Sequence, residues 1–190
     1  MFASSAVTRV TSGLADLRCD HHWSRSLDGP SGAHVSVCGR YRTLLWRTFA
    51  MGADAAPLVF CMLNPSTADA VLDDPTIRRC LGFAQREGAG GIIVVNLLPW
   101  RATDPSDLNR AYQRGDDVFW ERGNREDIEL ARSFGPFVLA WGSGIRPWMD
   151  GQARFIRRFA GHALCLGKTK LGEPRHPLML PRAALLESYP

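Results

Sequence analysis

The sequence predicts an α/β fold: a three-layer α/β/α sandwich with a mostly parallel, four-stranded central sheet and an N-terminal hairpin. Three observations predict it. Four short, continuous apolar runs are typical of strands that are covered on both faces. Segments with helical spacing separate these runs, and such alternation favours a parallel sheet between helices. A chain of 190 residues with 45% apolar and 22% charged residues has the size and composition of one globular domain.

The elements are expected in a simple order. Residues 1–32 are polar and weakly periodic and are expected to form a tail, which leaves 33–190 as a single α/β domain. Residues 34–49 are rich in strand formers and broken at Gly39, which predicts the hairpin. The buried strands are expected at 57–63, 90–100, 136–144 and 162–167, with helices at 75–87, 117–133 and 152–161.

The first of these helices has clear start and stop signals. Asp74 is a good N-cap acceptor, Pro75 suits the first helical position, and Gly88 suits the end. Polar loops are expected at 101–108 and 168–181.

Several protein classes are disfavoured. No apolar run approaches the ~20 residues of a membrane helix, and the first residues lack the apolar core of a secretory signal. The five scattered cysteines favour reduced thiols and a cytoplasmic location. Cys19, His21 and His22 invite a metal site, but no second Cys/His pair lies at zinc-ligand spacing. No metal is expected, and no nucleotide-cofactor motif predicts a cofactor.

Polar residues follow each predicted strand. Ligands of open α/β sheets bind beyond the carboxyl ends of the strands, so these residues are expected to form a site. They are Asn64-Pro65-Ser66, Asn96, Trp141-Gly142-Ser143 and the loop that contains His176.

Each candidate has a structural alternative. Asn64 either acts in a site or satisfies a turn before Pro65. Asn96 offers a donor and an acceptor that can recognise the edge of a nucleobase, or it is a turn amide. His176 either stabilises an oxyanion and moves a proton, or is a partly exposed loop histidine. Asp74, like Asp73, is better explained as a cap or first-turn charge than as a catalytic carboxylate.

Asp69 has no obvious helix to cap and therefore remains a catalytic candidate. A second group of residues is cationic, in a chain of net charge +4. These side chains either contact the phosphates of a nucleic acid or nucleotide, or belong to an ordinary solvated surface. The candidates are Arg78, Arg79, Arg101, Lys168, Lys170 and Arg175.

Long blocks of the sequence resemble one protein family. The blocks are "LNPSTADAVLDDPTIRRCLGFA", "VNLLPWRATDPSDL", "AWGSG" and "LGKTKLGEPRHPLMLP". They resemble the bacterial and phage family of domains of unknown function numbered 1643, over residues 38–182. This resemblance implies no activity.

Shorter blocks are similar to the uracil-DNA glycosylase superfamily. "MLNPS", "IIVVNLLPWRA", "VLAWGS" and "RHPL" follow predicted strands in the order of that superfamily's motifs. Asn64-Pro65 resembles the Asn-Pro of the mismatch-specific thymine and uracil glycosylases, in which the Asn positions the attacking water. Asn96 matches the base-reading Asn, and His176 matches the histidine of the last motif.

That likeness implies a DNA-base-processing enzyme that hydrolyses the N-glycosidic bond of an unusual or modified base. Single- or double-stranded DNA would be its partner. Two departures are visible: Ser66 replaces a glycine, and Leu178 replaces a serine that contacts DNA phosphate. The stacking aromatic is also unassigned, unless Trp100 or Trp141 serves. Two alternatives therefore stay open: a hydrolase of free nucleotides or nucleosides, and a non-catalytic nucleic-acid-binding module.

Overall fold

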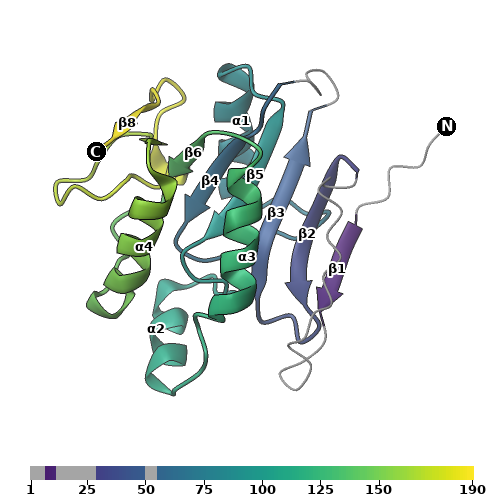
Figure 1. Cartoon of the computed structure of the whole chain (residues 1–190), viewed down its shortest axis with the longest axis vertical. Helices are drawn as coiled ribbons and strands as arrows, with labels where there is room; N and C mark the ends of the chain where they lie inside the picture. Colours follow the sequence, from purple (N-terminus) through teal and green to yellow (C-terminus); the bar gives the residue numbers. More distant parts are fainter. Residues whose placement is uncertain (1–6, 12–28, 50–54) are drawn as a thin grey trace.

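The computed structural model describes residues 7–11, 29–49 and 55–190. Helices pack on a single sheet whose strand order is β1-β2-β3-β5-β4-β6-β7-β8 (Figure 1). The strands are β1 (Val7–Thr11), β2 (Ser31–Ser36), β3 (Arg42–Thr48), β4 (Leu58–Met62), β5 (Gly91–Asn96), β6 (Phe137–Leu139), β7 (Ala163–Cys165) and β8 (Glu187–Tyr189). The helices are α1 (Pro75–Arg86), α2 (Pro105–Gln113), α3 (Glu121–Arg132) and α4 (Asp150–Ala160), with 3₁₀ turns η1 (Pro147–Met149) and η2 (Pro177–Met179).

The mixed α/β class is confirmed, but the predicted strand count is wrong. Strands β5, β4, β6 and β7 are parallel neighbours at the centre. The hairpin strands β2 and β3 join the same sheet, with β3 antiparallel to β5. Strand β1 pairs with β2, and β8 pairs antiparallel with β7. Among the described residues the sheet has eight strands, because the exposed backbone groups at the edges of the parallel block pair with these further segments.

Each face of the sheet has its own apolar core. On one face, helices α2, α3 and α4 cover alternate strand residues such as Val59 and Val95. On the other face, α1 and the C-terminal segment cover the intervening residues, such as Phe60 and Val94. In Figure 1 the sheet accordingly lies between α3 and α4 in front and α1 behind. The arrangement is a three-layer sandwich, because the strands alternate apolar side chains toward both faces.

Helix α1 forms as its sequence indicates. The Asp74 carboxylate accepts a hydrogen bond from the Ile77 amide at 2.9 Å, so the predicted N-cap is confirmed. Pro75 occupies the first helical position, and Gly88 follows the helix with a φ of 70°. The side chains that face the sheet are Ile77, Cys80, Phe83 and Ala84.

The N-terminal boundary differs from the prediction. Residues Val7–Thr11, within the predicted tail of residues 1–32, form strand β1, and the boundary at residue 33 falls inside β2. Cys19, His21 and His22, which invite a metal site but are not expected to bind a metal, lie outside the described residues. Within the part of the chain that the structure describes, no helix is long and apolar enough to cross a membrane.

The chain changes direction around β4. From β4 it passes through α1 to β5 on one side, and from β5 it passes through α2 and α3 to β6 on the other side. Strand β4 therefore has neighbours that the chain reaches by crossovers in opposite directions. Such a switch point opens a crevice at the carboxyl ends of the strands, where ligands of α/β folds bind.

Candidate functional site

A cleft of about 600 Å³ lies at the carboxyl ends of β4 and β6. Its walls come from the segment after β4, the start of α1, the turn after β6 and the loop before η2. Its lining residues are Arg42, Met62, Leu63, Asn64, Ser66, Thr67, Asp74, Pro75, Thr76, Ile77, Ala102, Thr103, Trp141, Gly142, Ser143, Gly144, His176 and Leu178.

Asn64 presents an oxygen to this cleft. Its Nδ2 donates to the carbonyl oxygens of Pro65 at 3.1 Å and of Ala102 at 2.8 Å. Because both partners are acceptors, the amide nitrogen must face them, which fixes the orientation of the side chain. The Oδ1 atom accepts no hydrogen bond from the described residues and remains available to a ligand or water. The turn interaction expected as the alternative is therefore present, but it uses only the amide nitrogen.

His176 faces the same cleft with a defined tautomer. Its Nδ1 accepts a hydrogen bond from the Leu178 amide at 3.3 Å, as the cap of η2. Burial lowers the pKa of His176 below its usual range, partly opposed by the Asp74 carboxylate. The ring is therefore neutral near pH 7, and its proton lies on Nε2. His176 is thus a hydrogen-bond donor at the cleft.

Trp141 and Gly142 form the wall beside His176. The indole Nε1 of Trp141 donates to the Glu173 carboxylate at 2.6 Å, and the same carboxylate pairs with Arg157. These bonds tie the end of β6 to the loop that carries His176. Gly142 has a φ of 76°, and its amide donates to the Pro174 carbonyl at 2.8 Å. Trp141 and Gly142, which are among the predicted substrate-binding residues, thus line the cleft.

Arg42 is the cation of the cleft lining. Its side chain comes from the start of β3, is only 1% exposed, and donates from Nη1 to the Ala68 carbonyl at 2.9 Å. The Nε atom has no hydrogen-bond partner among the described residues. Burial lowers its pKa to about 10, so the guanidinium keeps its charge at pH 7. Sequence reasoning missed Arg42, although a charged residue in a strand otherwise typical of burial is a visible signal.

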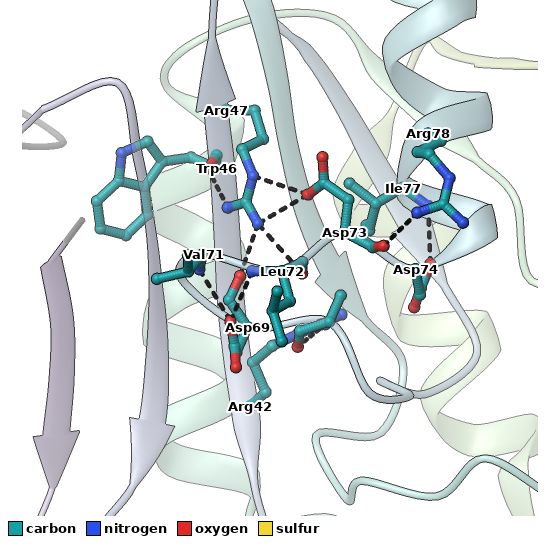
Figure 2. A network of polar contacts seen from close by, with 11 residues as sticks. Arg42, Trp46, Arg47, Asp69, Val71, Leu72, Asp73, Asp74, Ile77 and Arg78 are labelled. Carbon is teal, nitrogen blue, oxygen red and sulfur yellow. Dashed lines mark hydrogen bonds and ion pairs between the residues drawn. The ribbon is translucent and has the colours of Figure 1, made fainter. Parts of the chain in front are cut away.

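Arg47 organises the loop between β4 and α1 (Figure 2). Its guanidinium donates to the Asp73 carboxylate at 2.9 Å and to the Asp69 carbonyl at 2.7 Å. The Asp69 carboxylate itself accepts from the amides of Val71 and Leu72, both at 2.8 Å, and these bonds lower its pKa. Asp69 is not among the residues that line the cleft. Asp69 and Asp73 therefore shape this loop, and Asp74 caps the helix that follows it.

Asn96 does not reach the cleft wall. It is fully buried at the end of β5, where it pairs in register with the cleft residue Met62. Neither atom of its side-chain amide has a partner among the described residues. Pro65 is also buried and outside the lining, although its carbonyl holds Asn64. Ser66 lines the cleft, and its hydroxyl lies 3.4 Å from that of Thr103.

The predicted phosphate-binding residues divide into two groups. Arg78 and Arg79 line a second groove of about 650 Å³, together with Arg86 and Arg182. This groove shares Pro75 and Leu178 with the cleft, so the two are adjacent.

The other cations lie elsewhere. Arg101 donates to the carbonyls of Gly39, Ser66 and Thr67, so it ties loops together. Lys168, Lys170 and Arg175 are exposed and outside both hollows. Among the described residues, no group of three or more His, Cys, Asp or Glu side chains is arranged to hold a metal ion.

The model of one family, described as "Protein of unknown function (DUF1643)", matches residues 40–178. The chain belongs to this family. The part that matches the DUF1643 family runs from just before β3 to η2 and contains every residue that lines the cleft. No curated protein and no solved structure matches the chain.

The exposure of two apolar side chains in η2 was not predicted from the sequence. Leu178 is 38% exposed and lines both the cleft and the second groove, and the neighbouring Met179 is 88% exposed. Both belong to η2, the short turn that His176 caps. Two large apolar side chains in a proline-bearing loop are a signal in the sequence, but their exposure is decided by how that loop packs.

Proposed function

We propose that this protein is a DNA-base-processing enzyme that hydrolyses the N-glycosidic bond of an unusual or modified base, in the manner of uracil-DNA glycosylases. One observation carries the proposal: the oriented acceptor of Asn64 and the neutral donor of His176 line the same cleft at the switch point of the sheet. These are the two polar functions that cleavage of a glycosidic bond requires at its opposite ends.

The proposed chemistry follows from the charges that develop. As the bond breaks, the sugar becomes cation-like and the base becomes anion-like. The free Oδ1 of Asn64 would accept a hydrogen bond from water and direct its oxygen at the sugar. As the bond from C1′ to the base nitrogen breaks and the bond from C1′ to the water oxygen forms, the departing base anion takes up the proton that the water loses. The Nε2–H of His176 would donate to the base oxygen as negative charge grows there. A neutral histidine can do this without losing its proton, as the lowered pKa favours.

Access to a base within DNA requires it to leave the stack. Leu178 lines the cleft, and its neighbour Met179 is exposed in the same turn; together they would supply the apolar wedge that such proteins insert between bases. The arginine-lined second groove begins at the same place and suits the phosphates of the adjoining strand. Base recognition by Asn96 would require the cleft to deepen, since that side chain is buried.

A second function is favoured by Arg42. A buried cation in the cleft suits a substrate that brings its own phosphate, which describes a free nucleotide. The apolar Leu178, at the position where the glycosylases contact DNA phosphate through a serine, is consistent with this alternative. A non-catalytic nucleic-acid-binding module is the third reading, and the same experiment separates all three.

The decisive experiment is a base-release assay on single- and double-stranded oligonucleotides that carry a panel of modified and mismatched bases. Free nucleosides and nucleotides are assayed in parallel, and DNA binding is measured at low salt. The variants are Asn64→Ala and His176→Gln. Each should lower release by about a hundredfold or more, as is typical for general acid–base and oxyanion-stabilising groups. Asn109→Ala and His162→Gln, which alter the same residue types outside the cleft, should leave release unchanged.

The other outcomes are equally informative. Release from free nucleotides alone would replace the proposal with the second function. DNA binding without release would favour the binding module. The absence of both base release and DNA binding would overturn the proposal. Full base-release activity of both cleft variants would overturn it too.

A further inference from the structure

The strongest unexplained feature of the molecule is the state of the Arg42 side chain. An arginine has five N–H donors, yet the described residues provide Arg42 with one side-chain bond, from Nη1 to the Ala68 carbonyl. Its Nε is buried and has no partner. The side chain is 1% exposed, and the space it borders is the cleft. Buried charges in proteins are normally paired, so this arrangement is incomplete as it stands.

The nearby carboxylates do not complete it. Asp74 and Asp69 both favour the charged form of Arg42, but neither forms an ion pair with it among the described residues. The Asp74 carboxylate caps the Ile77 amide, and the Asp69 carboxylate binds the amides of Val71 and Leu72.

Two other charged groups act in the opposite sense. Arg47 and Arg101 also lie close enough to disfavour the charge on Arg42. Arg47 has its own partner in Asp73, and Arg101 is directed to backbone carbonyls. The acidic residues around Arg42 are therefore committed elsewhere, and its buried Nε has no acceptor among the described residues.

A second feature of the same cleft favours an anion. Pro75, Thr76 and Ile77 form the first turn of α1 and line the cleft together with Arg42. The first turn of a helix carries the positive end of the helix dipole and backbone N–H groups. Here Pro75 has no N–H and the Ile77 amide already donates to the Asp74 carboxylate, so the Thr76 amide is the one of these three that is left for a ligand. Because α1 has 12 residues, this end has the full character of a helix N-terminus. The cleft thus combines a buried guanidinium with a helix start.

We propose that Arg42 and the first turn of α1 form an anion-binding subsite, and that this subsite takes a phosphate group of the ligand. The inference deepens the proposed function and rests on it only for the nature of the rest of the ligand. It assigns the substrate class: a phosphate-bearing nucleotide or a nucleotide unit of a DNA strand, as opposed to a nucleoside or free base. The planar guanidinium suits phosphate oxygens because it donates from two nitrogens at once.

Calorimetric binding measurements on the full chain test this subsite. The probes are the four common deoxynucleosides, their 5′-monophosphates, and short single-stranded oligonucleotides without a terminal phosphate. The monophosphates or the oligonucleotides should bind at least about tenfold more tightly than the nucleosides, as expected for charge-assisted hydrogen bonds. Preference for monophosphates identifies a free nucleotide as the source of the phosphate, and preference for oligonucleotides identifies the DNA backbone.

Three variants locate the effect. Arg42→Gln should abolish the advantage of the phosphate-bearing probe, and Arg42→Lys should keep part of it because the charge remains. Arg40→Gln removes an exposed arginine of the same hairpin, outside the cleft, and should change nothing. If Arg42→Gln fails to fold, the subsite is still tested by comparing the binding of the same probes to the unmodified protein and to Arg42→Lys.

Equal binding of nucleosides and phosphate-bearing probes would overturn the proposal. Full retention of the preference in Arg42→Gln would overturn it too, as would a lack of binding by every probe. Base release is a separate measurement. Phosphate-dependent binding without base release would support the subsite and contradict the enzymatic proposal. Base release that does not change in the Arg42 variants would support the enzymatic proposal and contradict the subsite.

Discussion

Gly142 and His176 are packed against each other across the turn that follows β6. A Cβ atom placed on Gly142 would lie 3.0 Å from the Cβ atom of His176, and the φ of Gly142 is 76°. Gly142→Ala should therefore destabilise the fold by about 1–3 kcal/mol and displace the imidazole from the cleft. Denaturant unfolding and the NMR signals of the His176 ring measure the two effects.

The matched control is Gly115→Ala. Gly115 has a similar φ of 82°, but nothing lies within 4 Å of an added Cβ. This variant should show the backbone strain of about 1 kcal/mol without any change at His176. Equal effects of the two substitutions on the ring would contradict the role assigned to the Gly142 contact.

The protonation of His176 predicts a pH dependence of stability. Burial lowers its pKa in the folded protein, so between the usual value near 6.5 and the lowered value the unfolded chain binds more protons. Stability should accordingly fall as the pH decreases through this window. His176→Gln should flatten that part of the profile when melting temperatures are compared between pH 7.5 and 5. An NMR titration of the ring should give a pKa below 6.5. A raised value would contradict the neutral donor.

The ion pair between Arg47 and Asp73 predicts a structural role for the loop before α1. The Nη2–Oδ1 distance is 2.8 Å, and the two side chains are 9% and 27% exposed. Arg47→Gln should lower the free energy of unfolding by about 2–3 kcal/mol, because it leaves a half-buried carboxylate and three backbone carbonyls without their donor. Arg122→Gln, at an exposed pair with Glu126, should cost less than about 0.5 kcal/mol. Similar losses in urea titrations would contradict this assignment.

Asp74 combines a cap with a position on the cleft wall, and two substitutions separate these roles. Asn caps helices as well as Asp does, so Asp74→Asn should keep the stability within about 0.5 kcal/mol. Asp74→Ala should lose about 1 kcal/mol by denaturant unfolding. We expect Asp74→Asn to retain base release. A variant of normal stability without release would show that the carboxylate takes part in the chemistry.

Much of the fold could be predicted because local signals coincide with tertiary ones. The four apolar runs became the parallel strands, and Asp74-Pro75 marked the start of α1. The same Asp-Pro signal at Asp104-Pro105 starts α2, but the helix has only nine residues and a largely polar surface, so its sequence predicts a loop. Strand β8 has three residues, and local sequence does not reveal its long-range pairing with β7.

The candidate site shows the same division. Asn64 and His176 follow buried strands and line the same cleft, because the strands that precede them, β4 and β7, run in the same direction and end at the same edge of the sheet. Asn96 was expected beside them, but the pairing of β5 with β4 continues beyond it. The amides of Leu97 and Leu98 still donate to the carbonyls of Met62 and Leu63. Asn96 therefore stays inside the sheet, and only the register reveals this.

The antiparallel direction of β3 has a consequence for where ligand contacts can originate. In a fully parallel sheet, the rim that holds the ligand is supplied only by residues that leave strands. Here β3 enters the sheet at that rim, beside the end of β5, where the Arg42 amide donates to the Pro99 carbonyl. A residue that begins a strand can thus work beside residues that end strands. A hairpin added to a doubly wound sheet therefore brings residues at the start of an antiparallel strand to the rim where the parallel strands end.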